Sequence, residues 1–284
     1  MRFVAEFREY QSIKDLLGIS LMISKLTKEC VVQISEESIL FVVAEESDRV
    51  APRVWFDVCV QNVFSRRAFH GLNDDHNFIN LTLNPSNLGK ALSSAKSTVI
   101  SCKIKLTNDP FTNLKIEIEQ DSTLNNEART VTHNIPISII SEYDYSIYEI
   151  PKVPKMDYLL ILPPVKIFKN IIDQFKKVSP TMSFLIKNDG NLHLTVDTDD
   201  VTISNYHSYL KVFNDSLDDY EFDEPSQRTC TIDCKKLSSF ISSLTMQSDF
   251  IDMICGIQNE KFMFFTSKNQ ENYTVNCIIP AVCF

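Results

Sequence analysis

The chain of 284 residues repeats one pattern of elements, and this repeat restricts its fold more than any other feature. In residues 78–96, a strand-like stretch of alternating apolar residues leads into a helix-like stretch with apolar residues at helical spacing, rich in serine and lysine. Residues 229–245 show the same strand followed by the same kind of helix. Two short strand-like segments come next in each half, and each half closes on a strand that ends in Ile-Pro, at Ile135-Pro136 and Ile279-Pro280. A repeat of this kind encodes one structural unit twice, so we expect two copies of one domain.

The front of each half also matches. A strand at 2–7 precedes a helix at 11–29, and a strand at 157–162 precedes a helix at 165–178. Two hairpin-related strands follow each helix, and in the second half they are joined through Asp189-Gly190, a pair that favours tight hairpin turns because glycine accepts a positive φ. Each half is therefore predicted to be a mostly antiparallel β domain with two helices, which places the chain in the α+β class.

The predicted boundaries are a first domain at 1–140, a connector at 141–155 and a second domain at 156–284. Two prolines in the connector deny ladder hydrogen bonds, which favours an extended strap. Within the second domain, 212–227 carries six acidic residues and no basic one, so it is expected to be a solvated, disordered loop.

Several classes of function are disfavoured by missing motifs. The chain has only 5 glycines and neither of the two common glycine-rich nucleotide-binding motifs, and no nucleophile elbow accompanies His133 or His193. Neither a secretory signal nor an apolar run long enough to span a membrane is found. The 8 cysteines are spread singly without a C-x-x-C pair, so buried reduced thiols are expected and a zinc site is not. We expect a protein that is not an enzyme, needs no cofactor or metal, and does not bind a membrane.

The charges of the chain are unevenly distributed. The formal net charge is -9, yet the four expected helices (11–29, 85–96, 164–178 and 234–246) contain eleven lysines and only three acids. The rest of the chain has 17 basic residues against 34 acidic ones. Solvated helix faces usually mix both signs, so a one-signed set of helices suits contact with nucleic-acid phosphates without sequence readout. The alternative is that these lysines only keep amphipathic helices soluble.

Helical spacing places most of these lysines opposite the apolar stripes, with Lys96 and Lys236 nearer the flanks. The stripe expected in the first helix is Leu16, Ile19, Ile23 and Leu26, and that in the third helix is Ile167, Ile171, Phe175 and Val178. The lysines expected to face DNA are Lys14, Lys25, Lys28, Lys90, Lys96, Lys166, Lys169, Lys176, Lys177, Lys235 and Lys236.

This pattern resembles the sliding-clamp fold of PCNA and its relatives, and within that group the Hus-type subunit of the nine-one-one checkpoint clamp. The resemblance covers essentially the whole chain and is carried by 19–28, by 103–108, by the run Arg129-Thr-Val-Thr-His-Asn-Ile-Pro-Ile137, and by Ile279-Pro280-Ala281. It implies helices on the inner wall of a ring around double-stranded DNA, bound without sequence specificity. It also implies a heterotrimer with two Rad-type subunits, placed by a clamp loader at damaged DNA, where it serves checkpoint signalling and tethers repair enzymes and checkpoint proteins.

The resemblance also implies sites on this chain. Subunits of such rings join through antiparallel edge strands, which would be 113–120 and 181–188 here, with Leu114, Ile116, Ile118, Phe184 and Ile186 as interface residues. A groove for partner peptides would be formed by Tyr148, Ile150, Val153, Pro280 and Ala281. The alternative for the connector residues is that they only fasten the strap to the sheets.

Two further features of the sequence predict which type of clamp subunit this chain is. The chain ends at Ala281-Val282-Cys283-Phe284 without a long tail of the kind that the signalling Rad-type subunit carries, and its acidic segment at 212–227 is longer than the corresponding loop of replication clamps. Both favour a Hus-type subunit, located in the nucleus with a cytoplasmic pool before assembly. The alternative is a homotrimeric, PCNA-like processivity clamp of replication.

Overall fold

The computed structural model describes residues 1–43, 52–71, 77–109, 111–121, 128–150, 152–153, 155–213, 227–246, 252–269 and 272–282. They form two compact units. Of the described residues, the first unit contains those within 1–44, 55–150 and 270–274, and the second contains those within 45–54, 151–269 and 275–284. The main division falls at Ile150, inside the predicted connector. Most of the acidic segment, 214–226, lies outside the described residues.

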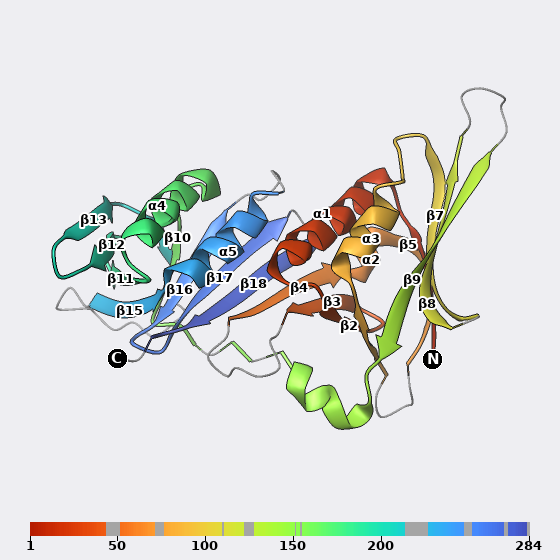
Figure 1. The fold of residues 1–284 in the computed structure, drawn as a ribbon, viewed down its shortest axis with the longest axis horizontal. Coiled ribbons are helices and arrows are strands. Elements are labelled where there is room, and N and C mark those ends of the chain that lie inside the picture. Colours follow the sequence, from red (N-terminus) through yellow and green to blue (C-terminus); the bar gives the residue numbers. More distant parts are fainter. Residues whose placement is uncertain are drawn as a thin grey trace. The chain divides into compact units, whose positions relative to one another are not determined.

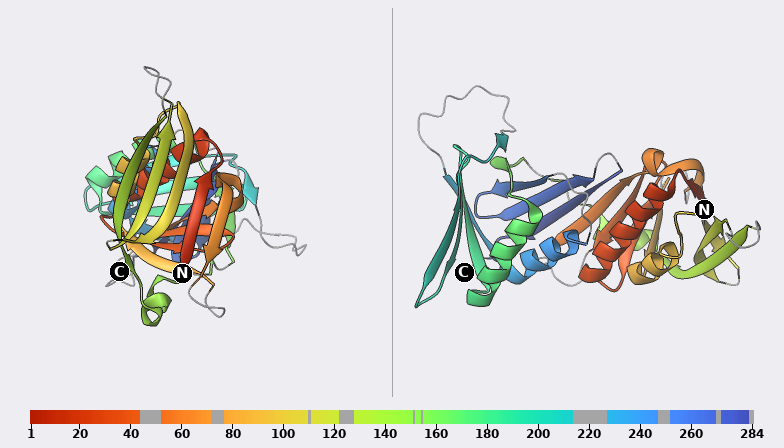
Figure 2. Two further views of the ribbon diagram at one scale, coloured as in Figure 1. Left: turned by 90° about the vertical axis from the view of Figure 1, so that its right-hand side faces the viewer. Right: turned by 90° about the horizontal axis from the view of Figure 1, so that it is seen from above.

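The first unit contains β1 (Arg2–Phe7), α1 (Tyr10–Leu26), β2 (Cys30–Ile34), β3 (Ser38–Val43), most of β4 (Arg53–Cys59), α2 (Val60–Val63), β5 (Phe64–His70), β6 (Ile79–Leu83), α3 (Pro85–Leu92), β7 (Val99–Asn108), β8 (Thr112–Gln120), β9 (Arg129–Ile139) and the 3₁₀ helix η1 (Glu142–Tyr148). Its strands lie in the order β5-β1-β7-β8-β9-β6-β2-β3-β4. Figure 2 (left) shows five of them, β9, β8, β7, β1 and β5, face on. The two longer helices, α1 and α3, pack beside each other (Figure 1).

The second unit contains β10 (Tyr158–Ile161), α4 (Val165–Val178), β11 (Thr181–Lys187), β12 (Leu192–Asp197), β13 (Thr202–His207), β14 (Val212–Phe213), β15 (Gln227–Asp233), α5 (Cys234–Leu244), β16 (Met253–Gln258), β17 (Phe262–Asn269) and most of β18 (Tyr273–Pro280). Its strands lie in the orders β14-β10-β16-β17-β18 and β13-β12-β11-β15. Here α4 packs beside α5 (Figure 1).

The strand orders confirm the internal repeat. Read from one end, β5-β1-β7-β8-β9 of the first unit corresponds to β14-β10-β16-β17-β18 of the second, and β4-β3-β2-β6 corresponds to β13-β12-β11-β15. Each correspondence also preserves the order along the chain. Two β-rich units with paired helices were predicted, whereas the strands β4, β5, β13 and β14 and the one-turn helix α2 were not.

The helices α3 and α5 each begin directly after a strand, and the residue just before each helix caps its amino end. The Asn84 side chain accepts hydrogen bonds from the backbone N–H groups of Ser86 and Asn87 at 2.9 and 3.2 Å, and Pro85 occupies the first helical turn, where its missing N–H costs nothing. The Asp233 carboxylate accepts from the Lys236 N–H at 2.9 Å at the start of α5. Both caps satisfy N–H groups that a helix leaves unpaired at its amino end.

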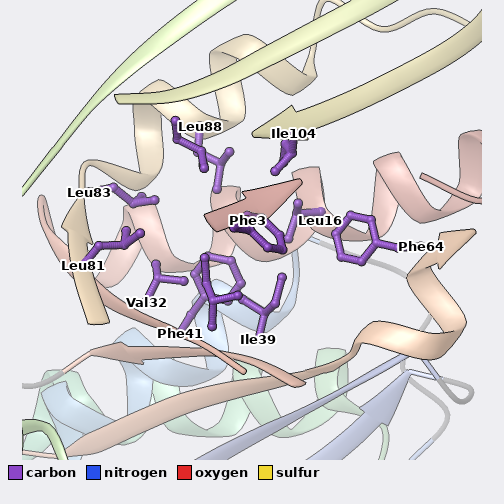
Figure 3. A pocket seen from close by; sticks show the side chains of 12 residues that line it. Phe3, Leu16, Val32, Ile39, Phe41, Phe64, Leu81, Leu83, Leu88 and Ile104 are labelled. Carbon is purple, nitrogen blue, oxygen red and sulfur yellow. The ribbon is translucent and has the colours of Figure 1, made fainter. Parts of the chain in front are cut away.

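The core of the first unit lies between its helices and its sheet (Figure 3). A small cavity of about 20 Å³ remains there, lined by Phe3, Val32 and Ile104 of the sheet and by Leu16 and Leu88 of the helices. A space of this size has room for about one water molecule, but its apolar walls offer no hydrogen bonds. It is therefore a dry packing defect rather than a ligand site.

Four phenylalanine rings join the helices of the second unit to both of its sheets. Phe168 of α4 lies 6.4 Å from Phe184 of β11, which lies 6.2 Å from Phe265 of β17, which in turn lies 6.2 Å from Phe240 of α5. All four side chains are at most 2% exposed. Aromatic pairs at these separations add to the stability gained from burial alone.

The predicted apolar stripe of α4 is wrong by one position. Phe168 and Ile172 are fully buried, whereas Ile167 is 53% exposed; Phe175 is buried as expected. The sequence offers two apolar rows that are one residue apart, about 100° around the helix, and both share Phe175. The row with the larger Phe168 ring, which contacts Phe184, is the one that packs on the sheet.

The connector also differs from the expected extended strap. Residues Glu142–Tyr148 form the 3₁₀ helix η1, and the ring of Tyr145 lies 5.2 Å from that of Phe78. The two prolines that favoured an extended chain come after this segment, so they do not oppose a helical turn within it.

Candidate nucleic-acid interface and assembly edges

The exposed face of α1 and α3 carries one sign of charge. Lys14, Lys25 and Lys90 are exposed on these helices, and the only acid in either helix, Asp15, is 2% exposed. The Asp15 carboxylate accepts hydrogen bonds from the side chains of Gln11 at 3.0 Å and Asn272 at 2.6 Å. The acid thus faces inward with polar partners, and it does not reduce the positive charge of the outer face.

The lysines at the carboxyl ends of these helices are exposed as well. Lys25 and Lys90 lie in the last turns of α1 and α3, where a positive charge interacts favourably with the helix dipole, and Lys28 and Lys96 follow just beyond. None of these four forms an ion pair with a described residue. No described residue therefore neutralises the charge of these four ammonium groups by an ion pair.

The face of α4 is different because it contains Asp173. This carboxylate pairs with Lys169 one turn earlier and lies 3.7 Å from the Lys176 ammonium; it also accepts a hydrogen bond from Ser238 of α5 at 3.0 Å. Lys176 in turn donates to the Ser238 hydroxyl at 2.8 Å. The hydrogen bond from Lys169, helped by that from Ser238, holds the pKa of Asp173 below its usual value. Two of the four α4 lysines are thus occupied by one acid.

The structure places the eleven predicted lysines as follows. Nine are exposed: Lys14, Lys25, Lys28, Lys90, Lys96, Lys166, Lys176, Lys177 and Lys235. Lys169 and Lys236 are half-buried. Their contact with DNA stays a prediction.

The predicted assembly edges are wrong. Strand β8 pairs along its length with β7 on one side and β9 on the other, and β11 pairs with both β12 and β15. The five residues expected at the edges are buried in the cores of the units instead: Leu114, Ile116, Ile118, Phe184 and Ile186 are at most 5% exposed. Alternation of apolar residues marks a half-buried strand, but it does not show whether a strand is central or at an edge.

The open edges lie one or two strands away. Strand β9 pairs with β8 over Arg129–Pro136 but with β6 only at residues 137–139, so one side of 129–136 has no described neighbour. Strand β13 pairs only with β12 among the described strands. One sequence signal was available, since proline within a strand is confined to edges and β9 contains Pro136.

The predicted peptide groove involves residues of both units. Tyr148 and Ile150 are half-buried in the first unit, whereas Val153 in the second is 42% exposed. Pro280 and Ala281, also in the second unit, are half-buried, and the Ala281 N–H donates to the Lys261 carbonyl at 2.8 Å. That these five residues line one groove stays a prediction. The sequence reasoning did not single out Tyr145, whose contact with Phe78 holds η1.

The two strand histidines have structural partners. His133 Nε2 lies 2.8 Å from the Ser94 hydroxyl, and the His193 ring packs edge-on against Tyr206 with 4.6 Å between centroids. Within the described ranges, no cluster of three or more His, Cys, Asp or Glu could hold a metal ion. Nor does any helix in those ranges combine the length and apolar character that a membrane crossing requires.

The described cysteines form no disulfide, and all but the half-buried Cys59 are buried. Burial raises the pKa of Cys30, Cys102 and Cys230 to about 12 and that of Cys234 to about 11. Since the thiolate is the reactive form, these thiols are poor nucleophiles and poor metal ligands at neutral pH.

Comparison with known proteins gives consistent results. The family described as "Hus1-like protein" matches residues 1–283. A Drosophila melanogaster protein named "Checkpoint protein Hus1-like" is 28% identical over 285 residues, covering 100% of both chains. The human "Checkpoint protein HUS1" is 27% identical over 286 residues, covering 99% of this chain and 100% of the human one.

Solved structures show the same fold at low sequence identity. The PCNA of Thermococcus kodakaraensis superimposes with a TM-score of 0.71 and 15% identity, covering 98% of this chain and 99% of the archaeal one. The Proliferating Cellular Nuclear Antigen of Entamoeba histolytica gives a TM-score of 0.69 and 14% identity, covering 99% of both chains. The predicted sliding-clamp fold is confirmed.

Proposed function

This chain belongs to the Hus1-like protein family and is a subunit of a checkpoint clamp, and from this premise we propose that it closes a ring with two different, Rad-type subunits and encircles double-stranded DNA. The observation that carries the proposal is the one-signed exposed face of α1 and α3 in a chain whose net charge is -9. In the nucleus, a clamp loader would place the ring at damaged DNA, where the ring would serve checkpoint signalling and tether repair enzymes.

The charge distribution supports contact with DNA through phosphates. An acidic protein is repelled by DNA unless its basic residues are gathered on a surface of their own, and within each unit most of the helix lysines are exposed. Lysine side chains that meet phosphates hold DNA without reading its sequence. A clamp that slides needs this kind of contact, since base-specific hydrogen bonds would stop it at particular sites.

The open edges support assembly with neighbours. Strands β9 and β13 each leave one side unpaired among the described strands, and they belong to different units. An exposed ladder of backbone N–H and C=O groups pairs readily with another strand. Because the two edges differ, the contacts are head-to-tail rather than self-complementary, and head-to-tail contacts close into a ring when the rotation per subunit permits.

The proposed activity is to hold DNA and partner proteins rather than to catalyse a reaction, and it needs no cofactor. The strand histidines, which would be the first candidates for a general base, are occupied by Ser94 and Tyr206. Buried thiols with raised pKa values do not supply a nucleophile.

The subunit arrangement is tested by measuring stoichiometry. We expect the purified chain to be monomeric in multi-angle light scattering and to form a 1:1:1 complex when both Rad-type subunits are added. A stable homotrimer of the chain alone would contradict the proposal and would support the replication-clamp alternative instead.

The DNA surface is tested by reversing lysine charges in the assembled ring. The test variant changes Lys25, Lys28, Lys169 and Lys177 to Glu, and the control variant changes Lys103, Lys187, Lys261 and Lys268, which lie on strands or turns outside the helices, to Glu. Each phosphate contact contributes about 0.9 to the slope of log K against log salt, so the test variant should flatten that slope by up to about 3 to 4. Equal effects of the two variants would show that the helix lysines act only through net charge.

A further inference from the structure

The open edge strand β13 carries two buried polar atoms without partners. Asn205 Oδ1 and His207 Nε2 are both inaccessible to solvent and have no hydrogen bond to any described residue. Only one other side-chain atom in the described part of the chain, Asn80 Oδ1, is in this condition. Two of the three thus lie two residues apart on one strand, and residues two apart share one face of a strand.

That face is the core side of the sheet. Asn205 lies opposite Leu194 of β12, and His207 lies opposite Leu192, and both leucines are fully buried. Burial lowers the pKa of His207, so its ring is neutral at pH 7 and has one donor and one acceptor nitrogen. An amide and an imidazole therefore border an apolar core at the rim of the sheet.

The side chains of Tyr206 and Ser204, on the opposite face of β13, have partners within the chain. The Tyr206 ring packs against His193, and the Ser204 hydroxyl lies 3.3 Å from that of Thr195. The unpaired atoms are therefore confined to one face of the strand.

Buried polar groups in native proteins are almost always hydrogen-bonded, and an unpaired one calls for a physical explanation. At an open strand edge the missing partner can come from the strand that completes the sheet. A neighbouring strand places alternate side chains on each face, directly opposite those of β13.

We propose that β13 is completed by a strand of a different clamp subunit whose core-side residues carry hydrogen-bonding groups, and that Asn205 and His207 select this strand over a second copy of this chain. The inference rests on the proposed ring assembly and adds the chemistry by which one edge chooses its neighbour. The partner strand should have Ser, Thr, Asn or Gln at two adjacent core-side positions.

A second copy of this chain cannot meet that requirement with its own open edge. The core-side residues of β9 in the open stretch are Arg129, Val131, His133 and Ile135, which lie opposite Gln120, Ile118, Ile116 and Leu114 of β8. Any two adjacent positions of this row include Val131 or Ile135, neither of which has a polar side-chain atom. His133 Nε2 is already hydrogen-bonded to Ser94.

In every register that sets both residues opposite the open stretch, pairing β13 with β9 of another copy would therefore bury at least one of the two polar groups against an aliphatic side chain. The penalty falls on self-assembly alone, since a partner strand with polar core-side residues avoids it. Specificity of this kind, in which a wrong partner leaves a buried group unpaired, is a general device of selective interfaces.

The experiment compares an apolar variant, Asn205→Leu with His207→Leu, with the wild type. Self-association is measured by sedimentation velocity, and affinity for the neighbouring Rad-type subunit by titration with the purified protein. We expect the double variant to self-associate about tenfold more tightly and to bind the neighbour about tenfold more weakly, each shift corresponding to about 1.4 kcal/mol. The control, Thr202→Val with Ser204→Val, changes the opposite face of the same strand and should alter neither affinity.

The outcomes separate the inference from the proposed function. If the wild type joins neither Rad-type subunit, the proposed ring is wrong. If the wild type joins them and the double variant shows unchanged affinities in both assays, the ring stands and the selective role of Asn205 and His207 is overturned. A higher melting temperature without a change of partner would likewise overturn it, because it would show that the two groups are only a defect of the core.

A second variant keeps the test decisive if the double leucine variant is misfolded. Asn205→Ser with His207→Gln retains hydrogen-bonding groups on the core side, so it should keep the wild-type preference for the Rad-type subunit. Self-association of this variant as strong as its binding to the neighbour would contradict the inference.

Discussion

Replacing Asp173 by Asn tests how the α4 face is controlled. Asp173 is the only acid in α4, and it binds the ammonium groups of Lys169 and Lys176. Asn has nearly the same shape and can still accept the hydrogen bond from Ser238, but it has no charge with which to hold the lysines. We expect the Asp173→Asn ring to bind DNA more tightly at low salt than the wild type.

The magnitude follows from the number of lysines that are released. Two additional phosphate contacts would steepen the slope of log K against log salt by about 1.8. Between about 50 and 200 mM salt, the variant should therefore lose about tenfold more affinity than the wild type. The cost in stability is small, because partly exposed ion pairs contribute about 0.2–1 kcal/mol.

The stability cost also depends on pH. The pKa of Asp173 is lowered in the folded protein, so its ion pairs stabilise the fold above the unfolded-state pKa and lose this effect as the pH falls through the folded one. The melting temperatures of the wild type and of Asp173→Asn should therefore differ at pH 7 and converge in acid.

The assay is fluorescence anisotropy of a labelled duplex with the assembled ring over a salt series. Asp109→Asn is the matched control, because this exposed acid in the turn between β7 and β8 gives the same change of net charge away from the helices. An equal change of slope in both variants, or no change in either, would refute the idea that Asp173 restrains two lysines that can contact DNA.

Three further predictions concern stability and reactivity. Glu117→Gln should lower the stability of the fold by about 0.5–1 kcal/mol at pH 7, because Lys105 and Lys115 lie directly opposite each other and both bind this carboxylate. These lysines hold the pKa of Glu117 below its usual value, so the difference in stability from the wild type, measured by urea titration, should vanish in acid. Gly190→Ala should cost about 1–3 kcal/mol, because φ is 84° at this turn and an added Cβ would lie 2.3 Å from the Leu210 carbonyl oxygen; an unchanged thermal midpoint would contradict this account. The buried cysteines should react with a thiol reagent only as fast as the protein unfolds, and rapid modification of more than the half-buried Cys59 among the described thiols would show that the cores open more readily than their burial suggests.

Local patterns predicted the elements whose signals are local. The Asp-Gly turn at Gly190, the helix after Asn84 and the strand β18 that ends in Ile-Pro each depend on residues within a few positions of one another, whereas β9 continues past its Ile-Pro pair to Ile139. The internal repeat strengthened these predictions, since each element had an equivalent in the other half. Strand β13 was missed because its sequence, Thr-Ile-Ser-Asn-Tyr-His, alternates weakly and contains polar residues on both faces.

Strand order could not be predicted from the same patterns. Leu114 and Ile116 look like the apolar face of any strand, and only their pairing partners show that β8 is central. These partners come from separate segments of the chain, so the position of a strand within its sheet is a non-local property. For the same reason the unpaired groups of Asn205 and His207 cannot be recognised in the sequence, where the two residues appear as ordinary polar members of a strand.

The acids of the helices show why a count of charges in the sequence underestimates the net positive charge of one helix surface and overestimates that of another. Asp15 and Asp173 were counted equally, but Asp15 is turned inward and bound by Asn272, which is 257 positions away in sequence, whereas Asp173 lies on the lysine face. The first unit therefore presents more net positive charge than its helix composition indicates, and α4 presents less. If DNA is held by phosphate contacts, this chain should hold it mainly through the lysines of α1 and α3, with α4 contributing in proportion to how far Asp173 releases Lys169 and Lys176.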